Sequence, residues 1–175
     1  LAKFDDGDAY ARANPGSNGH SFFGNTSDKV RVGVPRSDQL EFFGEESARQ
    51  LFDQAVSNWQ SLSAELVEVD VDPLLRAAKL LYEGPWVAER HCALETILEQ
   101  RPDAVHEVVR KIVESAKNKD AITAFKAEYE LQKYRAYARG LFEKIDFLVS
   151  PTAPRSYLIR ELLEDPITLN SNMGF

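Results

Sequence analysis

The chain of 175 residues is 43% hydrophobic and 28% charged, which excludes an intrinsically disordered protein and suits one globular domain or part of a larger one. Its net charge of −7, without a basic cluster, argues against binding to nucleic acids and to anionic membrane surfaces. Cys92 is the only cysteine, which excludes an intramolecular disulfide, and no apolar run approaches the roughly 20 residues of a membrane-spanning helix.

The two ends of the sequence do not resemble natural termini. The chain begins at Leu1 without an initiator Met, and it stops at Phe175 directly after a segment expected to turn back into a core. We therefore expect residues 1–175 to be a fragment of a single domain, truncated at both ends. Since no signal-like segment opens the chain, we also expect a reducing, cytoplasmic location.

The first third of the chain is predicted to contain loops, two strands and one helix. Gly, Asn, Asp and Ser dominate residues 1–28, which predicts turns and loops. Alternation of apolar and polar residues predicts short strands over 30–34 and 66–71. Between them, apolar residues spaced by three and four predict a helix over about 45–62. Its expected buried stripe comprises Ala48, Leu51, Phe52, Ala55, Val56 and Trp59.

The rest of the chain is predicted to be mainly helical. Asp72-Pro73 favours a helix start, and Gly84-Pro85 ends that helix after about Tyr82. The order of elements indicates an α/β fold with a helical insertion. The later elements are helices over about 86–100, from Pro102 onward and over about 120–145, then a short buried strand over 147–149. The expected apolar positions of the longest helix include Ile122, Phe125, Tyr129, Tyr134, Tyr137, Ala138, Leu141 and Phe142.

Most residue types that commonly carry chemistry stand in no recognisable pattern. Cys92 and Ser150 lack the sequence context of an activated nucleophile. The Gly/Ser stretch at 16–19 lacks the Lys and the helix start of a phosphate-binding loop. The scattered histidines match no metal-ligand spacing, so no metal site is predicted; they are His20, His91 and His106.

A rigid loop is predicted at 150–154, where the last apolar strand ends. Two prolines in Ser-Pro-Thr-Ala-Pro prevent helix formation there. The ends of strands in α/β sheets are common positions for ligands, so this loop is a candidate wall of a binding site. A simple strand terminator explains the same residues equally well.

Tyr82 and Arg90 lie on either side of the helix break at Gly84-Pro85, so they could converge across the corner. Tyr supplies a hydroxyl group, and the planar guanidinium of Arg can bind a carboxylate through two parallel hydrogen bonds. The alternative is that Arg90 is solvated or paired with a neighbouring Glu83 or Glu89. The residues alone leave both interpretations open.

Several segments together resemble the amidase-signature family, and within it the allophanate hydrolases. The most specific is 147–154, which contains a Ser-Pro-Thr-Ala-Pro sequence shared by many amidases. The Tyr-Glu-Gly-Pro-Trp sequence within 81–90 and the Leu-Asn-Ser-Asn sequence at 169–172 are similar to allophanate hydrolases more narrowly. Residues 4–12 and 31–44 also resemble stretches of the family, so the likeness covers most of the chain.

The resemblance implies part of an amidase-signature domain, with a mixed sheet flanked by helices. Such enzymes use a Ser–cis-Ser–Lys triad, whose Gly/Ser-rich signature has no counterpart here, so no catalytic residue is assigned and the chain alone is expected to be inactive. Tyr82 and Arg90 match the pair that holds the substrate carboxylate. The implied reaction is hydrolysis of allophanate (N-carboxyurea) to ammonia and carbon dioxide in urea or triazine nitrogen breakdown, without a metal or cofactor. The resemblance also implies a homodimer and a urea carboxylase partner or fusion.

Two other hypotheses remain at this point. Another amidase-signature enzyme, of the biuret hydrolase or glutaminyl amidotransferase type, would not need an Arg placed to bind a carboxylate at position 90. A non-catalytic helical interaction module would need no catalytic triad.

Overall fold

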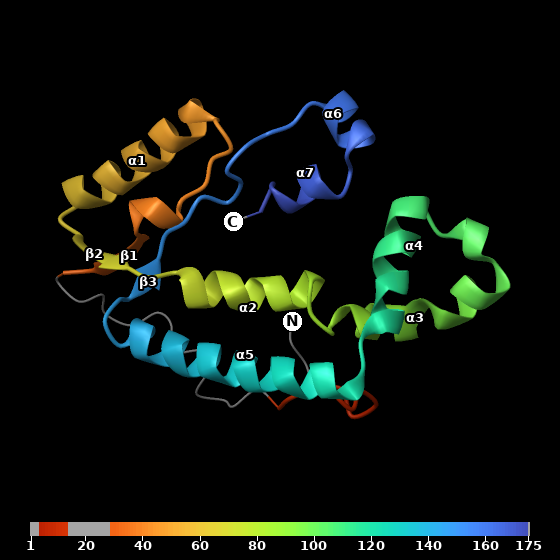
Figure 1. Cartoon of the computed structure of the whole chain (residues 1–175). Coiled ribbons are helices and arrows are strands. Elements are labelled where there is room, and N and C mark those ends of the chain that lie inside the picture. The colour runs from red at the N-terminus through yellow and green to blue at the C-terminus, as the bar shows by residue number, and fades with distance from the viewer. Residues whose placement is uncertain (1–3, 14–28, 175) are drawn as a thin grey trace.

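The computed structural model describes residues 4–13 and 29–174, and it has the expected order of strands and helices (Figure 1). Residues 4–13 contain turns and no helix or strand, whereas the rest of the loop predicted over 1–28 lies outside the described residues. The elements are β1 Arg31–Pro35, η2 Ser37–Gln39, α1 Glu46–Ser61, β2 Glu65–Val69, α2 Asp72–Tyr82, α3 Val87–Gln100, η3 Pro102–Ala104, α4 Glu107–Glu114, η4 Ser115–Asn118, α5 Ala121–Phe142, β3 Phe147–Leu148, α6 Ile159–Glu164 and α7 Thr168–Ser171.

The three described strands form a parallel sheet in the order β2-β1-β3. A crossover through α1 connects β1 to β2, and the long insertion from α2 to α5 returns the chain to β3 on the other side of β1. Because β1 is the central strand, its Val32 is fully buried. The sheet and its helical connections confirm the predicted α/β class.

Helices pack on the two faces of this sheet in separate apolar clusters. On one face, α1 and the loop before it pack against Val34; the buried members are Leu40, Phe42 and Phe52. On the other face, α2 and α5 pack against β2 and β3; the buried members are Val69, Val71, Leu141 and Ile145. Gly33 of β1 permits this second contact, because a Cβ there would lie 2.6 Å from Ile145 Cδ1.

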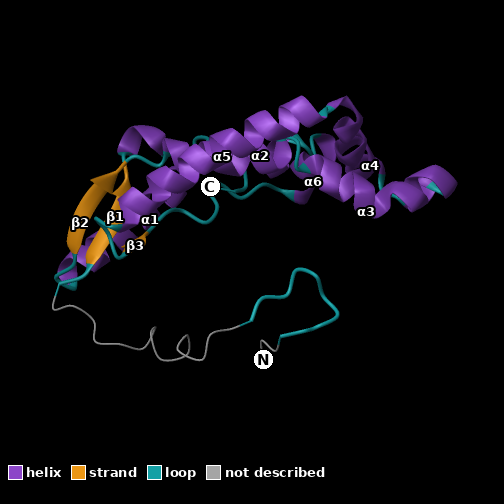
Figure 2. Ribbon diagram, turned by 90° about the horizontal axis from the view of Figure 1, so that it is seen from below, coloured by secondary structure: helices purple, strands orange, loops and turns teal. Residues whose placement is uncertain are grey.

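The helical insertion extends away from the sheet as an arm. Helices α2 and α5 lie side by side along the arm, and α3 and α4 form its far end (Figures 1 and 2). At the sheet end, the Tyr137 hydroxyl of α5 donates to the backbone carbonyl of Asp70, at 2.6 Å, just before α2. Helix α2 thus begins at the sheet, and its other end, the α2–α3 corner, lies away from the strands (Figure 1).

The predicted helix boundaries are wrong in two places. The helix expected from Pro102 onward is interrupted, because His106 caps a new helix and its Nδ1 accepts the Val108 N–H at 3.3 Å. The longest helix ends at Phe142 rather than at 145, which leaves Ile145 free to turn into the core, where it is 1% exposed.

Several apolar residues of two helices are exposed, and in α1 this includes part of the expected buried stripe. Ile122, Phe125 and Tyr129 of α5 are 63–64% exposed, because only the C-terminal part of this helix reaches the sheet. In α1, Leu51 is 72% exposed, whereas Phe52 carries the contact with the sheet. Within the part of the chain that the structure describes, no helix combines the length and the apolar character needed to cross a membrane.

Candidate functional site

The corner between α2 and α3 is formed by a helix end that only glycine allows. Helix α2 ends at Tyr82, and the N–H groups of Glu83 and Gly84 bond back to the carbonyls of Lys79 and Leu80. A Cβ at Gly84 would lie 2.3 Å from the Leu80 carbonyl oxygen, which is too close for any other residue. Pro85 cannot continue the helix, so the chain turns before it enters α3.

This turn brings Tyr82 and Arg90 together, which the sequence allowed but left open. The Arg90 Cζ atom lies 5.1 Å from the centre of the Tyr82 ring, so the guanidinium stacks over the aromatic face. Tyr82 is 64% exposed and offers its ring and hydroxyl at the surface. Among the described residues, neither Glu83 nor Glu89 forms an ion pair with Arg90, so the pairing interpretation is not observed.

The Tyr82–Arg90 pair has the donors that an anionic group needs. Arg90 carries up to five N–H donors in a planar fork, and Tyr82 adds one O–H donor. Stacking on the ring restricts the orientation of the guanidinium, whose N–H groups lie in its own plane and not toward the ring. The pair can therefore bind a planar carboxylate, and its role toward a substrate remains a prediction.

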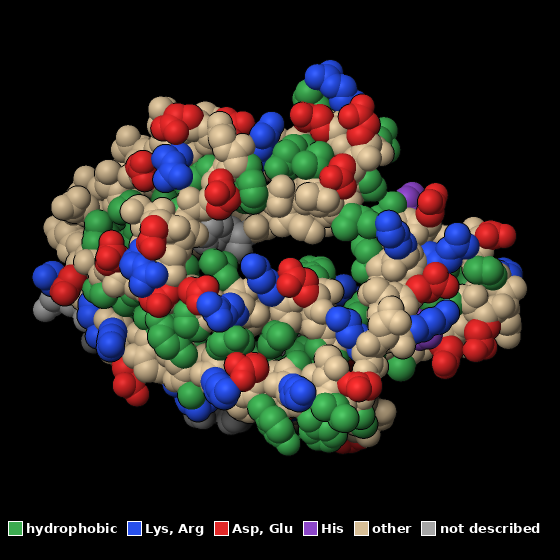
Figure 3. Space-filling view, viewed as in Figure 1, with side chains coloured by type: hydrophobic (Ala, Val, Ile, Leu, Met, Phe, Trp, Pro, Cys, Tyr) green, Lys and Arg blue, Asp and Glu red, His purple; other side chains and the backbone are tan. Residues whose placement is uncertain are grey.

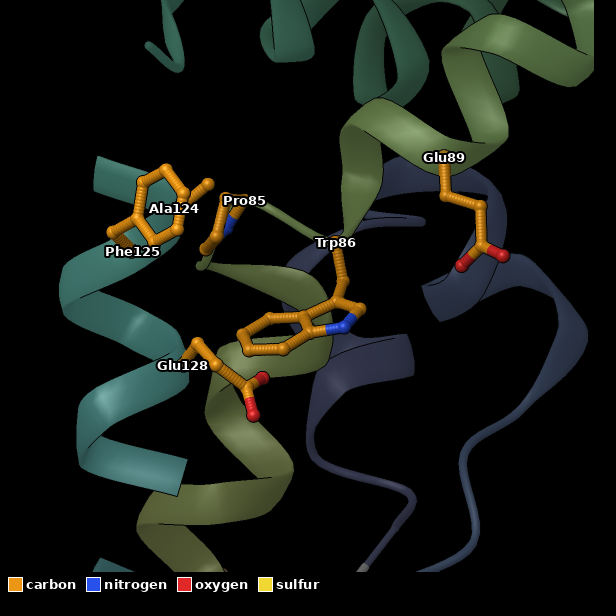
Figure 4. Close-up of a pocket in the computed structure, with 6 residues that line it drawn as sticks. All are labelled: Pro85, Trp86, Glu89, Ala124, Phe125 and Glu128. Carbon is orange, nitrogen blue, oxygen red and sulfur yellow. The ribbon is translucent and has the colours of Figure 1, made fainter. Parts of the chain in front are cut away.

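An open groove of about 470 Å³ lies beside the corner, between α3 and α5. Its floor is apolar, and two carboxylates border it. Figure 4 shows the Trp86 ring between the side chains of Glu89, from α3, and Glu128, from α5. Glu128 also accepts hydrogen bonds from Gln132 and, at 3.4 Å, from Arg135, so its charge is partly compensated. The other lining residues are Pro85, Ala124 and Phe125.

Sequence reasoning did not identify this groove, although one signal existed. Phe125 lines the groove, and the apolar side chains of Ile122, Phe125 and Tyr129 along α5 are all exposed. Figure 3 shows hydrophobic side chains gathered over this N-terminal half of α5. The excess of apolar residues along α5 could have indicated an exposed surface as well as a buried one.

The loop at 150–154 leaves the sheet at the opposite end of α2 from the corner (Figure 1). The Val149 N–H donates to the Gly33 carbonyl at 3.0 Å, and Pro154 is fully buried. The Nη1 atom of Arg155, the next residue, donates to the Phe43 carbonyl at 2.9 Å, which fixes the exit of the loop. The structure does not bring this loop together with Tyr82 and Arg90, and its role as a wall of a site remains a prediction.

The clearest pKa shifts on the sheet side of the molecule belong to groups with structural partners. The Gln39 side-chain amide donates a hydrogen bond to the Asp70 carboxylate at 2.6 Å, and the Asp72 backbone N–H donates another. Together they hold the pKa of the Asp70 carboxyl below its usual value. Burial raises the pKa of the Tyr137 hydroxyl. Among the described residues, no group of three or more His, Cys, Asp or Glu could hold a metal ion.

A known protein family matches almost the whole chain, including the α2–α3 corner. The family model described as Amidase matches residues 3–174. The chain belongs to the Amidase family. This confirms the resemblance to amidase-signature enzymes, and it makes the Tyr82–Arg90 corner part of an amidase domain.

The chain is similar to proteins named urea amidolyase and allophanate hydrolase. It is 34% identical over 150 residues to the urea amidolyase of Saccharomyces cerevisiae, which covers 85% of this chain and 8% of that protein. A solved allophanate hydrolase of Kluyveromyces lactis is 34% identical, with a TM-score of 0.79, and matches 85% of this chain and 24% of that one. The solved K. lactis urea amidolyase has the same identity and TM-score over 85% of this chain and 9% of its own. The chain thus spans about a quarter of the allophanate hydrolase.

Proposed function

We propose that this chain is part of the amidase domain of an enzyme that hydrolyses allophanate to ammonia and carbon dioxide. The relatives named allophanate hydrolase and urea amidolyase support this reaction class. Their greater length supports the proposal that residues 1–175 form one piece of a longer domain, and that a urea carboxylase unit is fused to it or acts beside it. A homodimer and a cytoplasmic location remain predictions.

The approach of Arg90 to Tyr82 is the observation that carries the substrate proposal. Allophanate ends in a carboxylate, whereas biuret ends in an uncharged amide at the same position. The Arg90 guanidinium, 5.1 Å from the Tyr82 ring centre, would bind that carboxylate through its fork, and the Tyr82 hydroxyl would donate to it. In this proposal the corner orients the substrate, and the nucleophile comes from elsewhere in the enzyme.

The proposal is tested by ammonia release from the full-length protein with allophanate, biuret and a simple aliphatic amide. Arg90→Ala should reduce kcat/KM for allophanate by about 2–4 kcal/mol, because a bound carboxylate would lose its charged partner. Arg90→Lys is the matched control for charge, and it should recover little, since an ammonium group cannot reproduce the fork.

Each result of this experiment has a definite meaning. A strong preference for allophanate that disappears in Arg90→Ala would support the carboxylate site. Equal turnover of the uncharged amides would leave an amidase of the biuret hydrolase or amidotransferase type, with a structural Arg90. Absence of turnover with every amide would favour the non-catalytic interaction module.

A further inference from the structure

A lysine distant in the sequence is bonded to the α2–α3 corner. The Lys119 Nζ atom donates to the backbone carbonyl of Glu83 at 2.8 Å, across 36 positions of the chain. Glu83 is the C-cap residue of α2, directly after Tyr82. Lys119 itself lies between η4 and α5, so this bond connects the far ends of the two helices that form the arm.

The end of α2 is a favourable place for an ammonium group. The last carbonyls of a helix have no partner within the helix, and the helix dipole concentrates negative charge there. Lys119 meets both requirements at once, because it supplies a donor and a positive charge to the Glu83 carbonyl.

The backbone of Lys119 is fixed by its contacts with η4. Its N–H donates to the Ala116 carbonyl at 2.9 Å, and Ala116 is 6% exposed. Helix α3 packs against η4, and Val87, its first residue, is fully buried. A fixed anchor therefore contacts a corner whose functional side chain, Tyr82, is 64% exposed and has little packing of its own.

We propose that Lys119 is a positioning residue for the Tyr82–Arg90 pair. Through the Glu83 carbonyl it holds the end of α2 at a set angle to α3, and this angle determines how Tyr82 and Arg90 face a carboxylate. The inference rests on the proposed function, because it assigns the purpose of the bond to substrate binding. Since the Glu83 carbonyl lies at the surface, water can replace the lysine, so loss of the bond should affect geometry more than stability.

Three single variants of the full-length protein test the inference. Lys119→Met removes the donor and the charge while keeping most of the side-chain length. Lys119→Arg keeps a donor and the charge. Lys117→Met is the matched control, because it loses the same charge nearby from a residue that pairs with Glu114, at 3.7 Å, and not with the corner. Steady-state kinetics with allophanate and thermal unfolding are measured for each.

Lys119→Met is expected to raise KM about three- to tenfold with little change in kcat, as for one lost charged hydrogen bond that acts on binding. Lys119→Arg should restore most of the affinity, and Lys117→Met should behave as wild type. In an Arg90→Ala background, Lys119→Met should cause no further rise in KM, because its effect passes through the pair. Tm should be similar for Lys119→Met and Lys117→Met.

The inference is overturned if Lys119→Met and Lys117→Met have the same KM, or if the KM effect persists in full in the Arg90→Ala background. A large fall in Tm that Lys119→Arg does not reverse would also overturn it, since that result indicates general loss of structure. The kinetics of the single variant Arg90→Ala distinguish a failure of this inference from a failure of the proposed function. If Arg90→Ala leaves KM and kcat unchanged, the carboxylate site itself is wrong, whatever Lys119 does.

Discussion

Gly33 illustrates how a missing side chain determines packing at the centre of the molecule. Gly33 lies in the central strand β1 and packs against Ile145, which is 1% exposed. A Cβ at this position would lie 2.6 Å from Ile145 Cδ1 and 3.3 Å from Leu148 Cδ1, both inside normal contact distance. The close approach of the helical insertion to the sheet therefore depends on glycine at this position.

Gly33→Ala should destabilise the protein by about 1–3 kcal/mol, because the added methyl group must displace the side chain of Ile145, which is buried in the core. The measurement is the free energy of unfolding from denaturant titration. Gly140→Ala is the matched control: it lies inside α5, with nothing within 4 Å of its added Cβ. That control should be stabilising by about 0.5–1 kcal/mol, since alanine favours a helix over glycine. A neutral Gly33→Ala would contradict the packing argument.

At the scale of elements, one ion pair joins the start of β1 to the chain entering β3. Asp146 accepts the Arg31 backbone N–H at 2.7 Å and pairs with the Arg31 guanidinium at 2.8 Å. The hydrogen bond from the Arg31 side chain is the main cause that lowers the pKa of Asp146. A carboxyl group whose pKa is lower in the folded state stabilises that state above its unfolded pKa, near 3.9.

Asp146→Asn should therefore lower Tm at pH 7, and the difference from wild type should shrink as the pH falls below about 4. As the pH falls from the unfolded pKa toward the lower folded pKa, the wild-type carboxylate progressively loses its contribution to stability. Thermal unfolding at pH 7, 5 and 3 checks this. Asp103→Asn is the control, because Asp103 pairs with Arg110 at 3.3 Å while its side chain is 99% exposed. A Tm difference for Asp146→Asn that is the same at all three pH values would disprove the linkage.

At the scale of the whole molecule, the described residues form a small sheet with α1 packed on one face and a long helical arm on the other (Figure 1). The Tyr82–Arg90 pair lies at the far end of α2, away from the strands. Figure 3 shows an opening between the α6–α7 segment and the arm.

We predict that residues 1–175 alone release no ammonia from allophanate, because the chain contains no recognisable triad signature and covers about a quarter of the solved allophanate hydrolase. The full-length protein, assayed in parallel, is the positive control. Detectable turnover by the isolated chain above that of its Arg90→Ala variant would show that a nucleophile has been overlooked within it.

The sequence by itself determined the features that depend on chain neighbours. Helix α2 has the predicted bounds, because Asp72-Pro73 and Gly84-Pro85 act on the backbone beside them. The same break allowed Tyr82 and Arg90 to converge, and the structure shows that they do. In both cases a few adjacent residues decide the local conformation.

Only the tertiary structure decided which apolar faces are covered and which distant residues meet. Ile122, Phe125 and Tyr129 have the spacing of a buried stripe, yet they are exposed because that half of α5 projects beyond the sheet. The bond from Lys119 to the Glu83 carbonyl joins residues 36 positions apart and leaves no pattern in the sequence. Periodicity reports that a helix has an apolar face, but the packing of other elements determines whether anything covers it.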